Sequence, residues 1–127
     1  MTAEYTVVFS DRVETMTPVL TTAQDEWRAA VALNGELDIA TAEQLRAELA
    51  GHLDAGRYVI RVDVGAVQFM DSTALGVLID ASEQCRRAHG SLILTNVPPR
   101  VQRIVQIAGL DALLLIDTAG AGRQASA

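Results

Sequence analysis

Short apolar runs alternate with segments of helical spacing through most of the 127-residue chain, and this alternation constrains the fold more than any other feature. The runs are rich in β-branched side chains, which favour strands. Strands that alternate with helices in this way indicate right-handed crossovers and a largely parallel sheet. The strands are expected over Trp27–Asn34, Tyr58–Val64, Ser91–Thr95 and Leu113–Ile116.

The beginning of the chain predicts an antiparallel addition to that sheet. Pro18–Thr22 is separated from Trp27–Asn34 by the polar turn Ala23–Glu26, which is the pattern of a hairpin. We therefore predict an α/β fold with a mixed, mostly parallel sheet, helices packed against it and an N-terminal antiparallel hairpin.

The domain organisation follows from the length and the absence of internal repeats, which favour a single hydrophobic core. The domain is expected over residues 16–117. Residues 1–15 precede it as an N-terminal extension, in which Tyr5–Phe9 is a candidate for a further edge strand. Residues 118–127 lack apolar side chains large enough to anchor them, so we expect a flexible C-terminal tail.

Three segments between the runs carry apolar side chains at helical spacing. The first begins with the capping box Thr41-Ala42-Glu43-Gln44, in which the Thr41 and Gln44 side chains satisfy backbone N–H groups. The second runs from Ser72 to about Ala88, where Gly90 stops it. The third begins at Pro98-Pro99, where a missing N–H costs little. The apolar positions include Ala42, Leu45, Leu49 and Leu53, then Leu75, Leu78 and Cys85, then Val101, Ile104 and Val105.

Charge and apolar patterning exclude several classes of protein. The net charge is −6 and the ten basic residues form no cluster, which disfavours binding to DNA or RNA because phosphates require grouped Lys and Arg. No apolar run approaches the ~20 residues that would span a bilayer. The N-terminus does not resemble a secretory signal and Cys85 is the only cysteine, so we expect a cytoplasmic protein.

The combinations of residues that most enzymes need are missing. Ser72 lacks the flanking glycines of a serine hydrolase elbow. His52 and His89 are each expected near the C-terminal end of a helix, where a cation interacts favourably with the helix dipole. Cys85 and His89 share a helix face but supply only two of the four ligands of a structural zinc site. With no phosphate-binding loop motif either, we predict no catalysis, no metal and no cofactor.

The segment Phe69–Leu78 holds the most informative polar residues. Asp71 or Ser72 can accept a hydrogen bond from N–H groups of the first helical turn, which is a sufficient structural reason for either residue. The same geometry exposes a hydroxyl to a kinase, and a phosphate there would face free N–H groups and the positive end of the helix dipole. Upstream, Glu36 and Asp38 are expected in a solvated turn in which Asp38 orients backbone groups.

Two segments, Asn34–Ala42 and Phe69–Leu78, carry the sequences NGELDIATA and FMDSTALGVL. In their residues, order and separation they resemble the motifs of the anti-sigma factor antagonists, a family built on the STAS domain. The resemblance implies a single STAS-like domain that binds an anti-sigma factor, releases a sigma factor and does not touch DNA. It further implies that the anti-sigma factor, an ATP-dependent serine kinase, phosphorylates Ser72, and that a protein phosphatase acts on phospho-Ser72.

The resemblance also implies a partner-binding surface drawn from both motifs. Thr73 is a secondary candidate for phosphorylation, and Ala74 stands where the family often has glycine. A phosphoserine adds about −1.5 to −2 charge, and a like-charge contact at an interface costs several kcal/mol, so phosphorylation is expected to switch binding off. The predicted partner-binding residues are Asp38, Asp71, Ser72, Thr73, Ala74 and Gly76. We expect Asp38, Asp71, Ser72 and Thr73 to cluster at the end of the sheet where strands are followed by helices.

Two alternatives from other classes stay open. One is a STAS module that is not phosphorylated and works as a scaffold or as a subunit of a lipid or anion transport complex. The other is an enzyme or small-ligand binder with a site at the carboxyl ends of the strands, the usual location in open α/β sheets. Identification of a partner separates the first from an antagonist, and turnover or a ligand-dependent thermal shift would reveal the second.

Overall fold

A five-stranded mixed sheet forms the centre of the molecule in the computed structural model, which describes residues 19–109 and 113–117. β1 pairs with β2 in antiparallel fashion, and the remaining neighbours are parallel. The predicted α/β fold with its N-terminal hairpin is therefore confirmed. In spatial order the strands are β1 (Val19–Ala23), β2 (Arg28–Leu37), β3 (Val59–Met70), β4 (Ser91–Thr95) and β5 (Leu115–Ile116).

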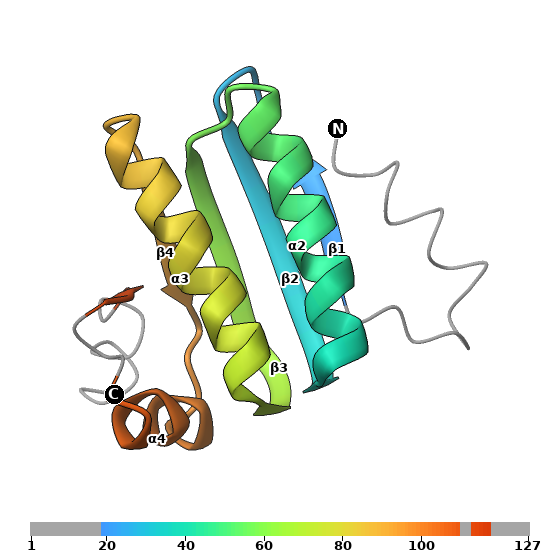
Figure 1. Ribbon diagram of the computed structural model, residues 1–127, viewed down its shortest axis with the longest axis vertical. Coiled ribbons are helices and arrows are strands. Elements are labelled where there is room, and N and C mark those ends of the chain that lie inside the picture. The colour runs from blue at the N-terminus through green and yellow to red at the C-terminus, as the bar shows by residue number, and fades with distance from the viewer. Residues whose placement is uncertain (1–18, 110–112, 118–127) are drawn as a thin grey trace.

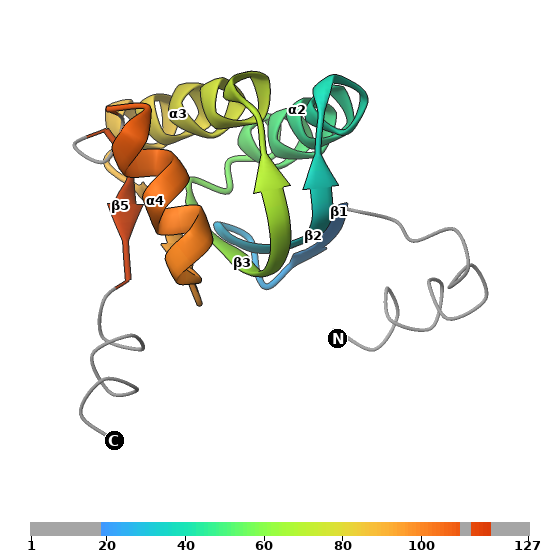
Figure 2. The ribbon, with the colours of Figure 1, turned by 90° about the horizontal axis from the view of Figure 1, so that it is seen from below.

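Two long helices, α2 (Ile39–Asp54) and α3 (Ser72–Arg87), lie side by side on one face of the sheet (Figures 1 and 2). The shorter α4 (Pro99–Ile107) stands apart from them and contacts β3. Arg100 links α4 to β3, because its Nε–H donates a hydrogen bond to the carbonyl oxygen of Val67 at 3.2 Å. One face of the sheet is thus covered by α2 and α3, and the other is more open.

Alternation along the strands decides which face each side chain takes, because successive residues of a strand point to opposite sides. The odd-numbered apolar residues of β2 and the even-numbered ones of β3 and β4 are buried against the helices. The other face carries mostly small or polar residues of the same strands, together with the half-buried Val59 and Ile93. The buried set includes Ala29, Val31 and Leu33 of β2, Ile60, Val62 and Val64 of β3, Leu92 and Leu94 of β4, and Leu45, Leu49, Leu75 and Leu78 of the helices.

The two central strands extend further than predicted. β2 continues past Asn34 to Leu37, and β3 continues past Val64 to Met70. Their register slips twice, between Ala32 and Asn34 and again after Gly35, so that β3 bulges against β2. Polar and glycine residues in this stretch end the apolar, β-branched runs from which the strands were predicted, although the backbone goes on pairing.

The predicted N-cap of the first helix is wrong. α2 begins at Ile39, and its cap is Asp38, whose Oδ1 accepts the N–H of Thr41 at 3.1 Å. Thr41 lies inside the first turn and donates its hydroxyl to the carbonyl oxygen of Asp38 at 3.0 Å. An aspartate is as good an N-cap as a threonine, and here it comes first along the chain.

The end of α3 also differs from the prediction. The residue with a left-handed backbone is His89, with φ of 67°, and not Gly90. Gly90 is needed for another reason: a Cβ at this position would lie 2.0 Å from the carbonyl oxygen of Tyr58. Glycine therefore serves close packing against the start of β3 rather than helix termination.

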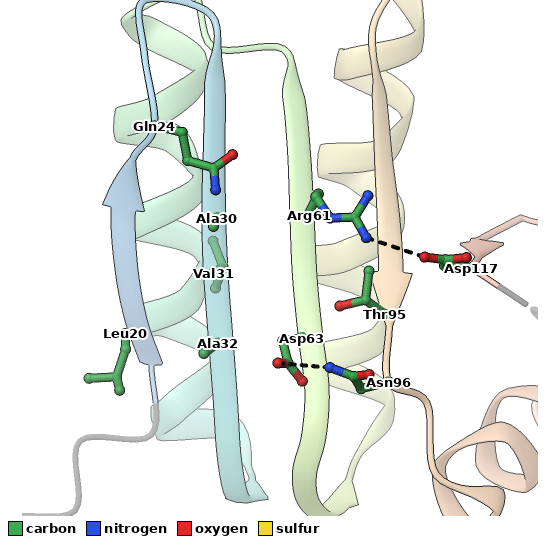
Figure 3. A pocket seen from close by; sticks show the side chains of 10 residues that line it. All are labelled: Leu20, Gln24, Ala30, Val31, Ala32, Arg61, Asp63, Thr95, Asn96 and Asp117. Atoms are coloured by element: carbon green, nitrogen blue, oxygen red, sulfur yellow. Dashed lines mark hydrogen bonds and ion pairs between the residues drawn. The ribbon is translucent and has the colours of Figure 1, made fainter. Parts of the chain in front are cut away.

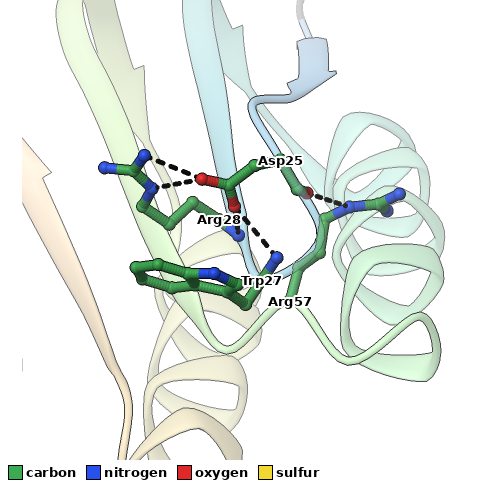
Figure 4. Close-up of polar contacts among 4 residues, drawn as sticks. All are labelled: Asp25, Trp27, Arg28 and Arg57. Atoms are coloured by element: carbon green, nitrogen blue, oxygen red, sulfur yellow. Dashed lines mark hydrogen bonds and ion pairs between the residues drawn. The ribbon is translucent and has the colours of Figure 1, made fainter.

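His52 was expected to act as a cationic cap at the end of α2, and this prediction is wrong. The side chain is buried, and burial together with the nearby Arg57 guanidinium lowers its pKa, which favours the neutral ring. The Nη1 atom of Arg57 lies 3.3 Å from Nδ1 of His52. The Nε–H of Arg57 donates a hydrogen bond to the carbonyl oxygen of Asp25 at 3.2 Å. Asp25 in turn forms an ion pair with Arg28, whose guanidinium lies over the Trp27 ring (Figure 4).

Several predicted features lie at the limits of the described residues. The N-terminal extension with the candidate strand Tyr5–Phe9, and the tail 118–127, fall outside them. The last strand is shorter than predicted, with Leu115–Ile116 in place of Leu113–Ile116. No helix within the described ranges is long and apolar enough to cross a membrane.

Candidate partner-binding site

Two helix starts meet at the carboxyl ends of β2 and β3. Asp38 follows β2 and caps α2, while Asp71 follows β3 and caps α3. The backbone N–H of Asp71 donates to the carbonyl oxygen of Leu37 at 3.1 Å, which holds the two caps next to each other. Parallel neighbouring strands end at the same edge of a sheet, so two residues that are far apart in the sequence share one surface.

Asp38 is held in its capping role by Thr41. Hydrogen bonds from the backbone N–H and the hydroxyl of Thr41 lower the pKa of the Asp38 carboxyl. The side chain is exposed and therefore carries a negative charge at the surface at neutral pH. Asp38 thus stabilises the start of α2 and also presents a carboxylate to solvent.

The sequence left open which of Asp71 and Ser72 caps the helix. In the structure Asp71 is the cap and Ser72 presents an exposed hydroxyl. Asp71 is the N-cap, and its Oδ1 accepts the N–H of Ala74 at 3.0 Å. The first intrahelical bond runs from the N–H of Leu75 to the carbonyl oxygen of Asp71, so the N–H groups of Ser72 and Thr73 precede the helical ladder. Ser72 is the first residue of the helix, and its side chain is exposed because it is not needed for capping.

The other predicted site residues differ in how accessible they are. Thr73 is half-buried, and Ala74 is completely buried in the core, so the Ala74 methyl group is not part of the surface. We therefore remove Ala74 from the predicted partner-binding set. Gly76 lies one helical turn after Ser72, on the same side of α3, and an added Cβ there would meet no atom within 4 Å.

The sequence prediction missed two apolar residues at this edge. Ile39, the first residue of α2, is 66% exposed, and Phe69, near the end of β3, is 50% exposed. Both stand in the two motifs, but their exposure could not be inferred from the sequence. For Phe69 it depends on the second register slip, which pairs Phe69 with Glu36 and turns Met70 and Leu37 into the core.

The two histidines and the cysteine lie away from this site. His52 lies 14 residues after Asp38 and His89 17 residues after Ser72, so each histidine is roughly 20–25 Å away along its helix. Cys85 is buried, which raises its pKa to about 11. Across the described residues, no three His, Cys, Asp or Glu side chains are placed to hold a metal ion. The site can present a hydroxyl, carboxylates and apolar groups to another molecule.

The open face of the sheet carries a depression of about 380 Å³ (Figure 3). Four of its polar side chains are paired with one another. Arg61 forms an ion pair with Asp117 at 3.2 Å, and Asn96 donates to Asp63 at 3.0 Å. Asn96 and Asp117 directly follow β4 and β5, at the carboxyl ends where we expected a small-ligand site, but their side chains are already engaged by Asp63 and Arg61.

Comparison with known proteins identifies the class. Residues 20–116 match the family described as "Mlab, STAS domain". The chain is 35% identical over 77 residues to BtrV of Bordetella bronchiseptica, covering 61% of this chain and 66% of BtrV. It is 32% identical over 99 residues to the anti-sigma-B factor antagonist of Bacillus subtilis, covering 78% of this chain and 90% of that protein.

Solved structures with the same fold include the anti-sigma factor antagonist SpoIIAA. Its unphosphorylated form superposes with a TM-score of 0.69 at 23% identity, covering 85% of this chain and 95% of SpoIIAA. The phosphorylated form of SpoIIAA superposes with a TM-score of 0.64 at 22% identity, covering 86% of this chain and 99% of SpoIIAA. At this level of identity the likeness concerns the fold.

The mixed sheet with α2 and α3 on one face, and the match over residues 20–116, define a STAS domain. The chain belongs to the STAS domain family and, within it, to the anti-sigma factor antagonists. These antagonists are regulatory proteins and not enzymes, and the same holds for this chain.

Proposed function

We propose that the unphosphorylated protein binds an anti-sigma factor serine kinase through the edge formed by Asp38, Asp71, Ser72, Thr73 and Gly76. Binding withdraws the kinase from a sigma factor, so that transcription is switched on without contact between this protein and DNA. Phosphorylation of Ser72 by the kinase ends the interaction, and a protein phosphatase restores it. This cycle operates in the cytoplasm, where sigma factors meet RNA polymerase.

The observation that carries the proposal is the position of Ser72. Its hydroxyl is exposed at the first residue of α3, next to two helix caps that belong to different motifs. Asp71 already caps the helix, so the Ser72 side chain has no structural task there. A modification of this hydroxyl can therefore change the surface without removing a hydrogen bond that the fold requires.

Electrostatics give the switch a sufficient magnitude. A phosphate on Ser72 would add about −1.5 to −2 charge beside the carboxylates of Asp71 and Asp38. A mismatch of charge at an interface costs several kcal/mol, and ~3 kcal/mol corresponds to roughly a 150-fold loss of affinity. The relatives named as anti-sigma factor antagonists, and SpoIIAA in its phosphorylated form, support this assignment.

The test is phosphorylation by the candidate anti-sigma kinases of the native host. The purified protein is incubated with each kinase and ATP, and intact mass and site mapping identify the product. We expect one phosphate on Ser72, none on Ser72→Ala, and unchanged modification of Thr73→Ala, the neighbouring hydroxyl. Binding of the kinase to the unphosphorylated protein, and its loss after modification, complete the cycle.

If no candidate kinase binds or modifies the protein, the proposal is wrong. A pull-down from the native host would then identify a scaffold or transport-complex partner instead. Phosphate incorporation on Thr73 alone would keep the kinase as the partner but move the switch by one residue.

A further inference from the structure

Two large apolar side chains are exposed at the edge that holds Ser72. Ile39 and Phe69 are 66% and 50% exposed, although both come from elements whose other apolar residues are largely buried. Leu37 and Met70 pair across β2 and β3; Ile39 lies two residues after Leu37, and Phe69 one residue before Met70. The two exposed side chains therefore lie close in sequence to the junctions of β2 with α2 and of β3 with α3.

The exposure of Phe69 is imposed by the backbone. The second register slip in β3 aligns Phe69 with Glu36 and Met70 with Leu37. Leu37 and Met70 then fill the core with almost no exposed surface, which leaves Phe69 on the other side of the strand. A phenylalanine that is half exposed gains little from folding, so the fold by itself does not account for an aromatic residue here.

Acidic residues lie at the same edge as these apolar side chains. Glu36, Asp38 and Asp71 lie on the same edge, and none of them forms an ion pair within the described residues. The ion pairs of the described residues lie elsewhere, at Asp25–Arg28, Glu43–Arg46, Arg61–Asp117, Glu83–Arg86 and Glu83–Arg87. A surface that combines exposed apolar side chains with carboxylates is complementary to an apolar pocket bordered by Lys or Arg.

We infer that Ile39 and Phe69 are the apolar anchors with which the unphosphorylated protein enters a pocket with a basic rim on its anti-sigma kinase. This inference rests on the proposed function and names the contacts that supply the affinity. Interfaces obtain most of their binding energy from a few desolvated side chains, aromatic ones above all, surrounded by polar groups that exclude water. A phosphate on Ser72 would carry its charge into this desolvated region.

According to this inference, affinity for the kinase and phosphorylation depend on different residues. Asp38 and Asp71 orient the two helix starts, Ser72 receives the phosphate, and the apolar pair holds the kinase in place. Phe69→Ser should weaken binding roughly 30-fold and Ile39→Ser about tenfold, since truncated interface anchors lose affinity on this scale. Phe69→Leu keeps an apolar group at the position and should stay within about fivefold of the wild type.

The experiment measures the affinity of each unphosphorylated variant for the kinase found in the phosphorylation assay, without ATP. Trp27→Ser is the matched control, because Trp27 is an exposed aromatic residue, 54% exposed, at the amino end of β2 and so at the opposite end of the sheet. We expect this control to bind like the wild type. Thermal unfolding of every variant shows that the fold is kept, and raising the salt from about 0.05 M to about 0.3 M should weaken wild-type binding if the rim is basic.

The outcomes distinguish the two proposals. If the wild type binds the kinase and the folded Phe69→Ser and Ile39→Ser variants bind within about twofold of it, the anchors are wrong and the proposed function stands. A loss of the same size in Trp27→Ser would also overturn the assignment of the surface, and affinity that salt does not change would overturn the basic rim. If the wild type binds no kinase, the proposed function fails and the anchors fail with it.

Discussion

Asp71 combines a structural and a surface role in one side chain. Its carboxylate accepts the N–H of Ala74 at 3.0 Å at the start of α3 and also lies beside the exposed hydroxyl of Ser72. Replacing an N-cap aspartate by alanine costs about 1 kcal/mol, whereas asparagine caps almost as well. Asp71 can therefore be tested for its capping role apart from its charge.

We expect Asp71→Ala to lower the free energy of unfolding by about 1 kcal/mol, and Asp71→Asn to retain most of it. For a chain of this size the alanine variant should melt about 4 °C lower. Asp80→Ala, an exposed aspartate further along the same helix, is the control and should change stability by less than about 0.5 kcal/mol. Equal losses in the alanine and asparagine variants would show that the charge, and not the cap, stabilises α3.

His52 makes stability depend on pH. Its pKa is lowered by burial and by the Arg57 guanidinium, against a smaller opposite effect of Glu48, and its Nε2 has no partner within the described residues. The unfolded chain, with a histidine pKa of about 6.5, takes up the proton first as the pH falls. The contribution of the neutral ring is therefore complete above about pH 6.5 and is lost progressively below it.

The measurement is thermal unfolding of the wild type and His52→Gln at about pH 7.5 and about pH 5.5. Acidification should lower the melting temperature of the wild type more than that of the variant. The difference between the two proteins isolates His52, because all other titrating groups are common to both. A variant that loses as much as the wild type would mean that His52 does not become protonated preferentially in the unfolded state.

At the scale of elements, Gly76 inside α3 and Gly90 just after it differ in whether a side chain would fit. Gly76 lies in the interior of α3 with open space where a Cβ would stand, while a Cβ on Gly90 would lie 2.0 Å from the Tyr58 carbonyl oxygen. Gly76→Ala should stabilise the protein by about 0.5–1 kcal/mol, because glycine is unfavourable inside a helix. Gly90→Ala should destabilise it by about 1–3 kcal/mol or more, because the backbones of β3 and the α3–β4 turn must separate.

Urea unfolding of the two variants measures both effects on one scale. The Gly76→Ala protein also tests the partner-binding edge, since a methyl group one turn after Ser72 should hinder a kinase that approaches α3 closely. A stabilised variant with unchanged kinase affinity would remove Gly76 from that surface. A Gly90→Ala variant as stable as the wild type would contradict the close contact with Tyr58.

The sequence predicted the elements better than their ends. Apolar periodicity identified the helices and strands, because burial against the sheet follows it directly at residues such as Leu45, Leu75 and Ile60. The ends depend on local competition that periodicity does not report. Asp38 preceded Thr41 as a cap, and the bulges in β3 carried the strand past Gly65 to Met70. The exposure of Phe69 results from those bulges, so this part of the site was visible only in the structure.

At the scale of the whole molecule, the proposed switch and a group of stabilising contacts occupy opposite ends of the sheet. The caps, Ser72 and the exposed apolar pair lie at the carboxyl ends of β2 and β3. Figure 1 shows that α2 and α3 begin at these ends. The contacts of Arg57 with Asp25 (Figure 4) and with His52 join the other ends of β2, β3 and α2. A covalent change at Ser72 is therefore far from these contacts, and its effect should be confined to the surface.

Phosphorylation should accordingly leave the stability of the fold almost unchanged while it abolishes partner binding. A phosphate at the first residue of α3 gains about 0.3–1 kcal/mol from the helix dipole, which repulsion by the Asp71 carboxylate offsets. We expect the phosphorylated protein and Ser72→Ala to unfold within about 1 kcal/mol of the unmodified protein, as measured by calorimetry after removal of the kinase. A loss of more than about 2 kcal/mol on phosphorylation would mean that the switch disorders the start of α3 instead of repelling the partner from an intact surface.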